Sequence, residues 1–339
     1  MARYGMLINI DKCNGCYSCF LACRDEYEGN DYLPFSAAQP TAGKSWMKIV
    51  EKERGVTPKV KVDYIPVPCF QCSDAPCVNK SPNGAVYRRS DGIVIIDPEK
   101  AKGHREIVSY CPHRLIYWNE EKDIPQKCTF CAHLLAKGWK EPRCVEACPS
   151  GALVFGDLDD PNSEISKLVA SSKTEELNRA FDLNPNVRYI DLPKRFIAGE
   201  VVLGDNQSEC ASGIKVILTD GKDSLECKTD GFGDFEFGGL EASKKYMIRI
   251  GHKGYKTSER EVVTYSDLNL GVIELKPDKK TTNKPAKKPG QKINEKSIKR
   301  GVKKTGKKVT KIKTKKTNEK RVRKSVEKSA KKLKRKSNK

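Results

Sequence analysis

Residues 13–23 read CNGCYSCFLAC, which places four cysteines at the spacing C-x2-C-x2-C-x3-C. This spacing is typical of chains that hold a 4Fe-4S cluster with the first three thiolates while the fourth thiolate reaches a neighbouring cluster. A second stretch must then supply the missing ligand of the first cluster and the remaining ligands of its neighbour. The motif therefore predicts a fold that closes around two metal centres.

That second stretch lies at residues 128–148, where the last cysteine directly precedes Pro149 as it does in ferredoxin runs. Exchange of the fourth ligands predicts a first tetrad of Cys13, Cys16, Cys19 and Cys148. It predicts a second tetrad of Cys23, Cys128, Cys131 and Cys144. A zinc site needs only four ligands and would leave most of these cysteines unexplained.

A further run, CFQCSDAPCVNKSPNGA at residues 69–85, carries three cysteines and has Ser81 at the fourth position. Its expected partner, AKGHREIVSYCP at residues 101–112, keeps only its last cysteine. The four substituted positions, which together would be the complete ligand set of one cluster, are Ser81, Ala101, His104 and Ile107. The remaining third tetrad is Cys69, Cys72, Cys77 and Cys111. The twelve thiolates therefore predict three 4Fe-4S clusters, not four and not two.

Several histidines and one serine near these runs leave alternatives open. His104 could bind a metal and Ser81 could add a hydroxyl ligand, but Ala101 and Ile107 offer no ligand atom. A collapsed loop filled by side chains is therefore favoured over a fourth metal site. His113 and His133 could donate hydrogen bonds to cluster sulfur, or they could be surface or partner contacts.

Charge is distributed very unevenly along the 339 residues. Residues 276–339 hold 29 lysines and arginines but only 4 acidic residues, a net charge of +25, which leaves −4 for the rest of the +21 chain. This stretch is predicted to be a disordered, solvated Lys-rich tail, and contact of this tail with an anionic surface is kept as an alternative. It keeps open two other classes, a nucleic-acid-associated and a membrane-peripheral iron–sulfur protein.

No apolar run approaches the roughly 20 residues that cross a bilayer, so no transmembrane segment is expected. The stretch MARYGMLINIDKC lacks the basic region, the apolar region and the cleavage site of a secretory signal. We therefore expect a cytoplasmic location, in which clustered cysteines indicate metal binding and not disulfides.

The pattern predicts an α+β chain with four parts. Residues 1–157 form a ferredoxin-like domain with two paired modules, and residues 158–197 form a connector with one short helix. Residues 198–275 show seven short alternating strands separated by turns, which indicate a small all-β antiparallel sandwich, and 276–339 form the tail. Cys210 and Cys227 in the sandwich are expected to be small buried residues and not ligands.

The cysteine-rich block resembles the iron–sulfur subunit of molybdopterin oxidoreductases of the dimethyl sulfoxide reductase type. The phrases that carry this resemblance are GIVIIDPEKAKG, YWNEEKDIPQKCTFCAHLL and CVEACPSGAL. Members of that family usually carry four clusters in two paired ferredoxin modules. The resemblance implies a non-catalytic electron-transfer subunit in a heterodimer or larger complex with a large catalytic subunit, which alone holds the molybdenum or tungsten pterin.

The run TDGFGDFEFGGL followed by KKYMIRI is similar to prealbumin-like, immunoglobulin-like domains of the carboxypeptidase-regulatory and collagen-adhesin B type. Three predicted clusters followed by such a domain resemble the small subunits of transhydroxylases, hydroxylases and dehydroxylases of phenols. This implies that the partner acts on a phenolic substrate. The resemblance covers about residues 1 to 275 and not the tail. The chain itself shows no nucleophile–base set and no phosphate-binding glycine loop.

Overall fold

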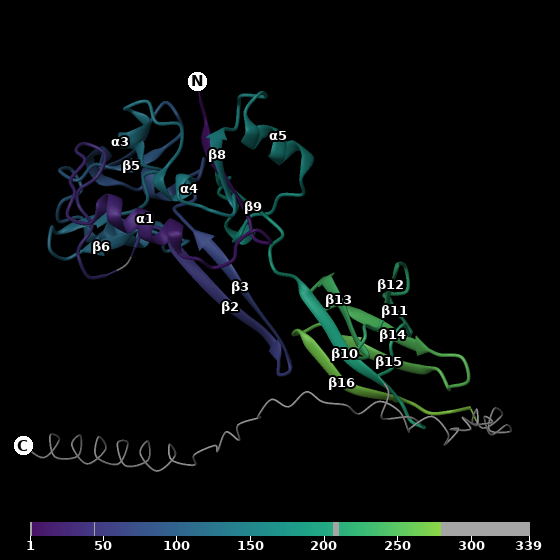
Figure 1. The fold of residues 1–339 in the computed structure, drawn as a ribbon. Coiled ribbons are helices and arrows are strands. Elements are labelled where there is room, and N and C mark those ends of the chain that lie inside the picture. Colours follow the sequence, from purple (N-terminus) through teal and green to yellow (C-terminus); the bar gives the residue numbers. More distant parts are fainter. Residues whose placement is uncertain (1, 44, 206–209, 279–339) are drawn as a thin grey trace, which may run out of the picture. The chain divides into compact units, whose positions relative to one another are not determined.

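The computed structural model describes residues 2–43, 45–205 and 210–278 (Figure 1). The tail expected at residues 276–339 lies almost wholly outside the described residues. Within the described part, no helix is long and apolar enough to cross a membrane.

A three-stranded sheet of order β8-β1-β9 organises the cysteine-rich part. The central strand β1 (Tyr4–Asn9) pairs antiparallel with β8 (Leu153–Asp157) and parallel with β9 (Val187–Ile190). Both faces of β1 are covered, and Met6, Leu7 and Ile8 are at most 2% exposed. The strand β9 belongs to the stretch assigned to a connector by sequence, so this stretch is in part an element of the sheet.

The expected short helix of the connector is α5 (Glu164–Ser171). The Ser163 side chain caps it by accepting a hydrogen bond from the Ser166 backbone N–H. Ile165 is fully buried and packs within van der Waals reach of Gly156 on β8. The helix therefore covers the sheet and packs as the amphipathic pattern predicts.

The segments that carry the cysteines are short, because each turn positions a thiol and few residues separate one turn from the next. Large apolar side chains from the insertion between the first two cysteine runs complete their core, and Tyr27, Trp46 and Met47 are at most 2% exposed. The elements are α1 (Ser18–Tyr27), α2 (Pro76–Asn79), α3 (Ala132–Leu135), α4 (Arg143–Glu146), β4 (Val86–Arg88), β5 (Val94–Ile96), β6 (Tyr117–Asn119), β7 (Ile124–Gln126) and the 3-10 turns η1 (Pro82–Gly84), η2 (Arg105–Tyr110) and η3 (Arg179–Phe181).

A long hairpin of β2 (Lys48–Val56) and β3 (Lys59–Val67) extends from this part (Figure 1). Near its base the Tyr64 ring covers Gly15 in the loop between Cys13 and Cys16. Gly15 has φ +69°, and a Cβ there would lie 2.6 Å from the ring. Only glycine fits both the left-handed backbone and this close approach.

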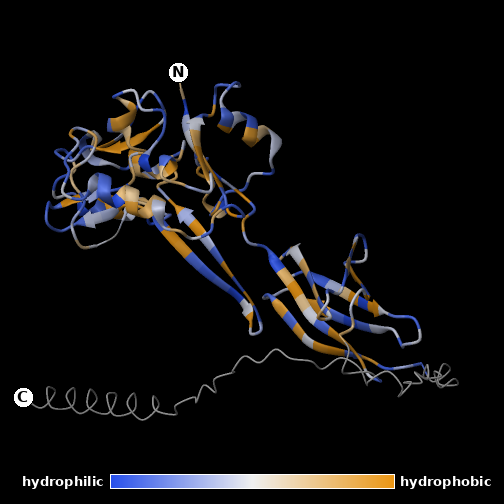
Figure 2. Cartoon of the chain, viewed as in Figure 1, coloured by the Kyte–Doolittle hydropathy of each residue, from blue (hydrophilic) through white to orange (hydrophobic). Residues whose placement is uncertain are grey.

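The C-terminal part of the described chain consists of two sheets that share one core. One has the order β13-β10-β16 and the other β12-β11-β14-β15. Buried and exposed residues alternate along several of these strands. Figure 2 shows hydrophobic and hydrophilic bands along them. All seven expected strands are present: β10 (Arg195–Leu203), β11 (Lys215–Thr219), β12 (Ser224–Lys228), β13 (Asp234–Leu240), β14 (Lys245–Gly251), β15 (Ser258–Val263) and β16 (Leu268–Leu275).

Two details differ from the expectation for this region. The strands β10 and β16 pair in parallel, which is possible because five other strands form the connection between them. Cys210 is exposed and not buried, since it forms only an isolated bridge to Val202 and the next residue, Ala211, fills the core instead. Cys227 is half-buried.

The hairpin contacts the two-sheet region through Arg54. This guanidinium pairs with Asp63 on the neighbouring strand and with Asp267, at 3.1 Å, before β16. It also donates to the Lys194 carbonyl at 2.7 Å and lies over the Phe196 ring. The side chains of Arg54 and Asp267 are only 8% and 3% exposed, so this ion pair is largely removed from water.

Candidate metal centres

The helix α1 connects two of the predicted tetrads. It carries Cys19 and Cys23, which are four residues apart and therefore lie on the same face. The two cysteines belong to different tetrads, and α1 packs beside α4, which carries Cys144. The two helices thus bring the first and second tetrads next to each other.

The first tetrad is the most open one. Cys16 is exposed, while Cys13 and Cys148 are half-buried and Cys19 is buried. Burial, then repulsion from Cys13 and Cys148, raises the pKa of Cys19 to about 12. Burial also acts on Cys148, but hydrogen bonds from the Ser150 side chain and nearby backbone amides lower the pKa of that thiol overall. All four thiols of this set are electrostatic neighbours.

The second tetrad lies deepest. Cys23, Cys131 and Cys144 are only 6–7% exposed. Burial is the main reason why the pKa of Cys144 lies well above its ordinary value, and repulsion from the other three members adds to it. A neutral thiol is a poor metal ligand, so these thiols need a cation to hold them as thiolates.

Hydrogen-bond donors face the sulfurs of the second tetrad. The backbone N–H of Phe130 donates to Cys128 Sγ at 3.5 Å, and Gln39 Nε2 lies 4.0 Å from Cys23 Sγ. The buried Tyr27 hydroxyl hydrogen-bonds the Cys131 thiol and lowers the pKa of that thiol against the larger effect of burial. Such donors favour the thiolate form and stabilise negative charge on sulfur.

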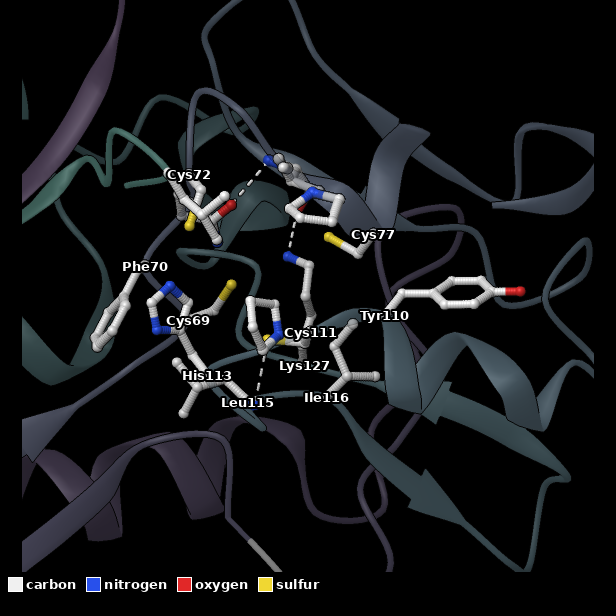
Figure 3. A pocket seen from close by; sticks show the side chains of 16 residues that line it. Cys69, Phe70, Cys72, Cys77, Tyr110, Cys111, His113, Leu115, Ile116 and Lys127 are labelled. Carbon is white, nitrogen blue, oxygen red and sulfur yellow. Dashed lines mark hydrogen bonds between the residues drawn. The ribbon is translucent and has the colours of Figure 1, made fainter. Parts of the chain in front are cut away.

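The third tetrad surrounds a cavity, with the thiols of Cys69, Cys72, Cys77 and Cys111 in its wall (Figure 3). The exposed lining of this cavity is almost entirely apolar. Burial is the main cause that raises the pKa of Cys72 to about 12. The Leu115 backbone N–H donates to Cys111 Sγ at 3.4 Å.

These donor sets fit iron–sulfur clusters, which are held by four thiolates each. His113 lines the third cavity, and its buried Nε2 has no hydrogen-bond partner among the described residues. An orphaned nitrogen of this kind suits a sulfur acceptor. Across the described ranges, no three His, Cys, Asp or Glu side chains converge as the ligands of a single metal ion do.

The three tetrads form a row. Cys144 of the second tetrad has Cys19 of the first among its electrostatic neighbours. On the other side, Cys128 of the second tetrad has Cys69 of the third as its strongest thiol neighbour. The second tetrad therefore lies between the other two, which is the arrangement that a linear relay requires.

Apolar side chains fill the place where a fourth ligand set would stand. Ala101 and Ile107 are fully buried and pack in one small core with Val86, Ile96 and Ile116. The remaining two positions have other partners: Ser81 Oγ accepts the Val86 backbone N–H at 2.8 Å, and His104 Nδ1 lies 2.8 Å from Glu106 Oε1. These contacts engage Ser81 Oγ and His104 Nδ1, while Ala101 and Ile107 offer no ligand atom.

This packing gives a first prediction. Replacing Ile107 with alanine should lower the free energy of unfolding by about 2–5 kcal/mol, because it removes a fully buried side chain and leaves a cavity. The matched control is Val108→Ala on the same turn, where the side chain is only partly buried. Urea denaturation under anaerobic conditions measures both. An Ile107→Ala cost no larger than that of the control would show that this core is not closely packed.

The other histidine candidate, His133, does not face cluster sulfur. It is buried, its Nε2 lies 2.8 Å from Glu26, and its ring stacks on Tyr32 at 3.7 Å. Lys127 also lies near the thiols, and no sequence motif marks it. Nothing in its local sequence distinguishes it, since Lys12 also directly precedes a C-x2-C pair and is exposed.

This chain is similar to known iron–sulfur proteins. A family model described as a 4Fe-4S dicluster domain matches residues 60–158. The pyrogallol hydroxytransferase small subunit of Pelobacter acidigallici is 38% identical over 81% of this chain and the whole of that protein. The arsenate respiratory reductase iron–sulfur subunit of Shewanella sp. is 31% identical, over 56% of this chain and 96% of that protein. A putative dimethyl sulfoxide reductase iron–sulfur subunit of Halobacterium salinarum is 33% identical, over 56% and 80%.

The fold, the thiol tetrads and these similarities define an iron–sulfur electron-transfer protein with 4Fe-4S clusters. The chain belongs to the iron–sulfur subunits of the molybdopterin oxidoreductases of the dimethyl sulfoxide reductase type. Proteins of this class are small subunits of molybdoenzyme complexes, so a large catalytic partner is implied.

Proposed function

We propose that this chain holds three 4Fe-4S clusters, one in each tetrad, and relays single electrons to or from a molybdenum or tungsten pterin on a separate large subunit. Such clusters supply one-electron transfer, with potentials set by charge, burial and hydrogen bonds to sulfur. The observation that carries the proposal is the grouping of twelve thiols into three adjacent sets, with the vacated fourth set filled by Ala101 and Ile107.

The chain's own residues would perform four tasks in this relay. The cysteines hold the clusters, and the buried surroundings of the second tetrad exclude water from the middle of the row. Donors such as Tyr27 and Gln39 stabilise negative charge on the sulfurs of that tetrad. The exposed Cys16 places the first tetrad at the surface, where an electron can enter or leave.

We further propose that the partner acts on a phenolic compound in the cytoplasm. The support is the match to the pyrogallol hydroxytransferase small subunit, which spans that protein's whole length, including the region after the cysteine-rich part. The two sheets that share one core support the proposal that this region is a prealbumin-like sandwich. Its role in the proposed complex is to support the assembly.

The experiment that tests this proposal is anaerobic purification of the native complex through a tag on this chain. The expected result is molybdenum or tungsten bound in a ratio of about one per chain, together with reduction of the clusters when a phenolic substrate or product is added. Recovery of the chain with its clusters but without either metal would contradict the proposed partner. Clusters that react with arsenate but not with phenols would contradict the proposed substrate class.

A further inference from the structure

Lys127 is a lysine in the protein interior. It directly precedes Cys128, its side chain is 2% exposed, and it lines the cavity of the third tetrad. Figure 3 shows it among the labelled thiols of that tetrad. Its Nζ donates to the Val94 carbonyl and, at 3.1 Å, to the Cys128 carbonyl. These contacts fix the ammonium at one place between the second and third tetrads.

The surroundings of this ammonium lack an ordinary counter-charge. Both acceptors are neutral carbonyls, and no carboxylate of the described residues forms an ion pair with it. A buried cation is costly unless negative charge lies nearby. The thiols of Cys77 and Cys111 on one side and Cys128 on the other are its electrostatic neighbours, and in each case its charge lowers the pKa of the thiol.

We propose that the fixed positive charge of Lys127 raises the reduction potential of the cluster in the third tetrad. It raises the reduction potential of the cluster in the second tetrad to a smaller extent. This inference rests on the proposed function, because it requires clusters in these tetrads. Reduction adds one electron and therefore one negative charge to a cluster. A nearby buried cation stabilises the reduced form more than the oxidised form, since little water is present to screen it.

A consequence for the relay follows from the order of the tetrads. The first tetrad has the exposed Cys16, and in the described part of the chain the lysine at the position equivalent to Lys127 is Lys12, which is exposed to water. The third tetrad, at the other end of the row, then holds the electron more strongly. An electron that enters at the first tetrad would therefore collect at the end of the row that Lys127 occupies.

The test is a redox titration of the anaerobically purified full chain, monitored by EPR, for three Lys127 variants. Lys127→Gln and Lys127→Met remove the charge, and Lys127→Arg keeps it. We expect both neutral variants to lower the equilibrium constant for reducing one cluster at least ten-fold, which is 59 mV for one electron. In the neutral variants, the reduction potential of a second cluster should shift less, and that of the remaining cluster should not shift. The reduction potentials of the Lys127→Arg variant should stay near those of the wild type.

The matched control is Lys12→Gln, which removes the lysine at the same place before the other C-x2-C pair. Its charge is exposed to water, so we expect less than a three-fold change in the equilibrium constant for reducing any of the clusters. Unchanged reduction potentials in the neutral variants, or an equal drop in reduction potential in the Lys12→Gln control, would overturn the proposal. If both neutral variants lose a cluster and the arginine variant does not, the charge serves assembly and not potential, which also overturns it. Absence of clusters from the wild type would instead overturn the proposed function.

Discussion

Replacing Cys144 with alanine is expected to lower the iron content of the anaerobically purified protein from about twelve to about eight atoms per chain. Cys144 is only 6% exposed, and the thiols near it are Cys131, Cys128, Cys23 and Cys19, each of which is already assigned to a tetrad. The same change should interrupt electron transfer between the first and third tetrads, because the second lies between them. Iron and sulfide analysis measures the first effect, and the EPR spectrum after dithionite reduction measures the loss of one component.

The matched control for this change is Cys227→Ala. Cys227 is also partly removed from water, but it lies on β12, far along the chain from the tetrads. Iron content and EPR components should stay at the wild-type level in this variant. A Cys144→Ala protein that retains the full iron content would show that this thiol is not a ligand.

Replacing Arg54 with alanine is expected to lower the free energy of unfolding by about 3–5 kcal/mol. The change leaves the carboxylate of Asp267, which is 3% exposed, without its closest charged partner. A buried charge that loses its partner cannot recover the hydration it gave up on folding. The contact between the hairpin and the two-sheet region should weaken as a result.

The matched control here is Arg249→Ala. Arg249 also pairs with a carboxylate across a strand, but both Arg249 and Glu259 are more than half exposed, so we expect a cost below about 1 kcal/mol. Urea unfolding followed by circular dichroism compares the two variants. Equal costs would mean that burial does not set the strength of the Arg54 pair.

Sequence reasoning predicted those features of this protein that depend on local spacing. Within each cysteine run the turns keep the thiols that are near in sequence close together, while the division of the twelve thiols into three ligand sets stays a prediction. The seven strands of the C-terminal region were equally visible, since their apolar residues alternate as in the KYMIRIG stretch of β14. The filling of the fourth site by side chains could be predicted because Ala101 and Ile107 have no atom that can bind a metal.

Features that depend on distant contacts could not be predicted in this way. The pairing of β9 with β1 joins segments about 180 residues apart, and nothing in the sequence of either strand specifies its partner. Lys127 and Lys12 occupy equivalent positions before their cysteine pairs, yet one is buried and the other exposed. Their difference comes from neighbours such as β5, whose Val94 carbonyl accepts from Lys127.

The most direct test of the central claim is the joint determination of iron and acid-labile sulfide in the full chain, purified without oxygen. Three clusters predict about twelve iron and about twelve sulfide per chain, with three components in the reduced EPR spectrum. About sixteen of each would contradict the filled fourth site, and about eight of each would contradict the cluster proposed in the third tetrad. Zinc in place of iron would contradict the electron-transfer role altogether.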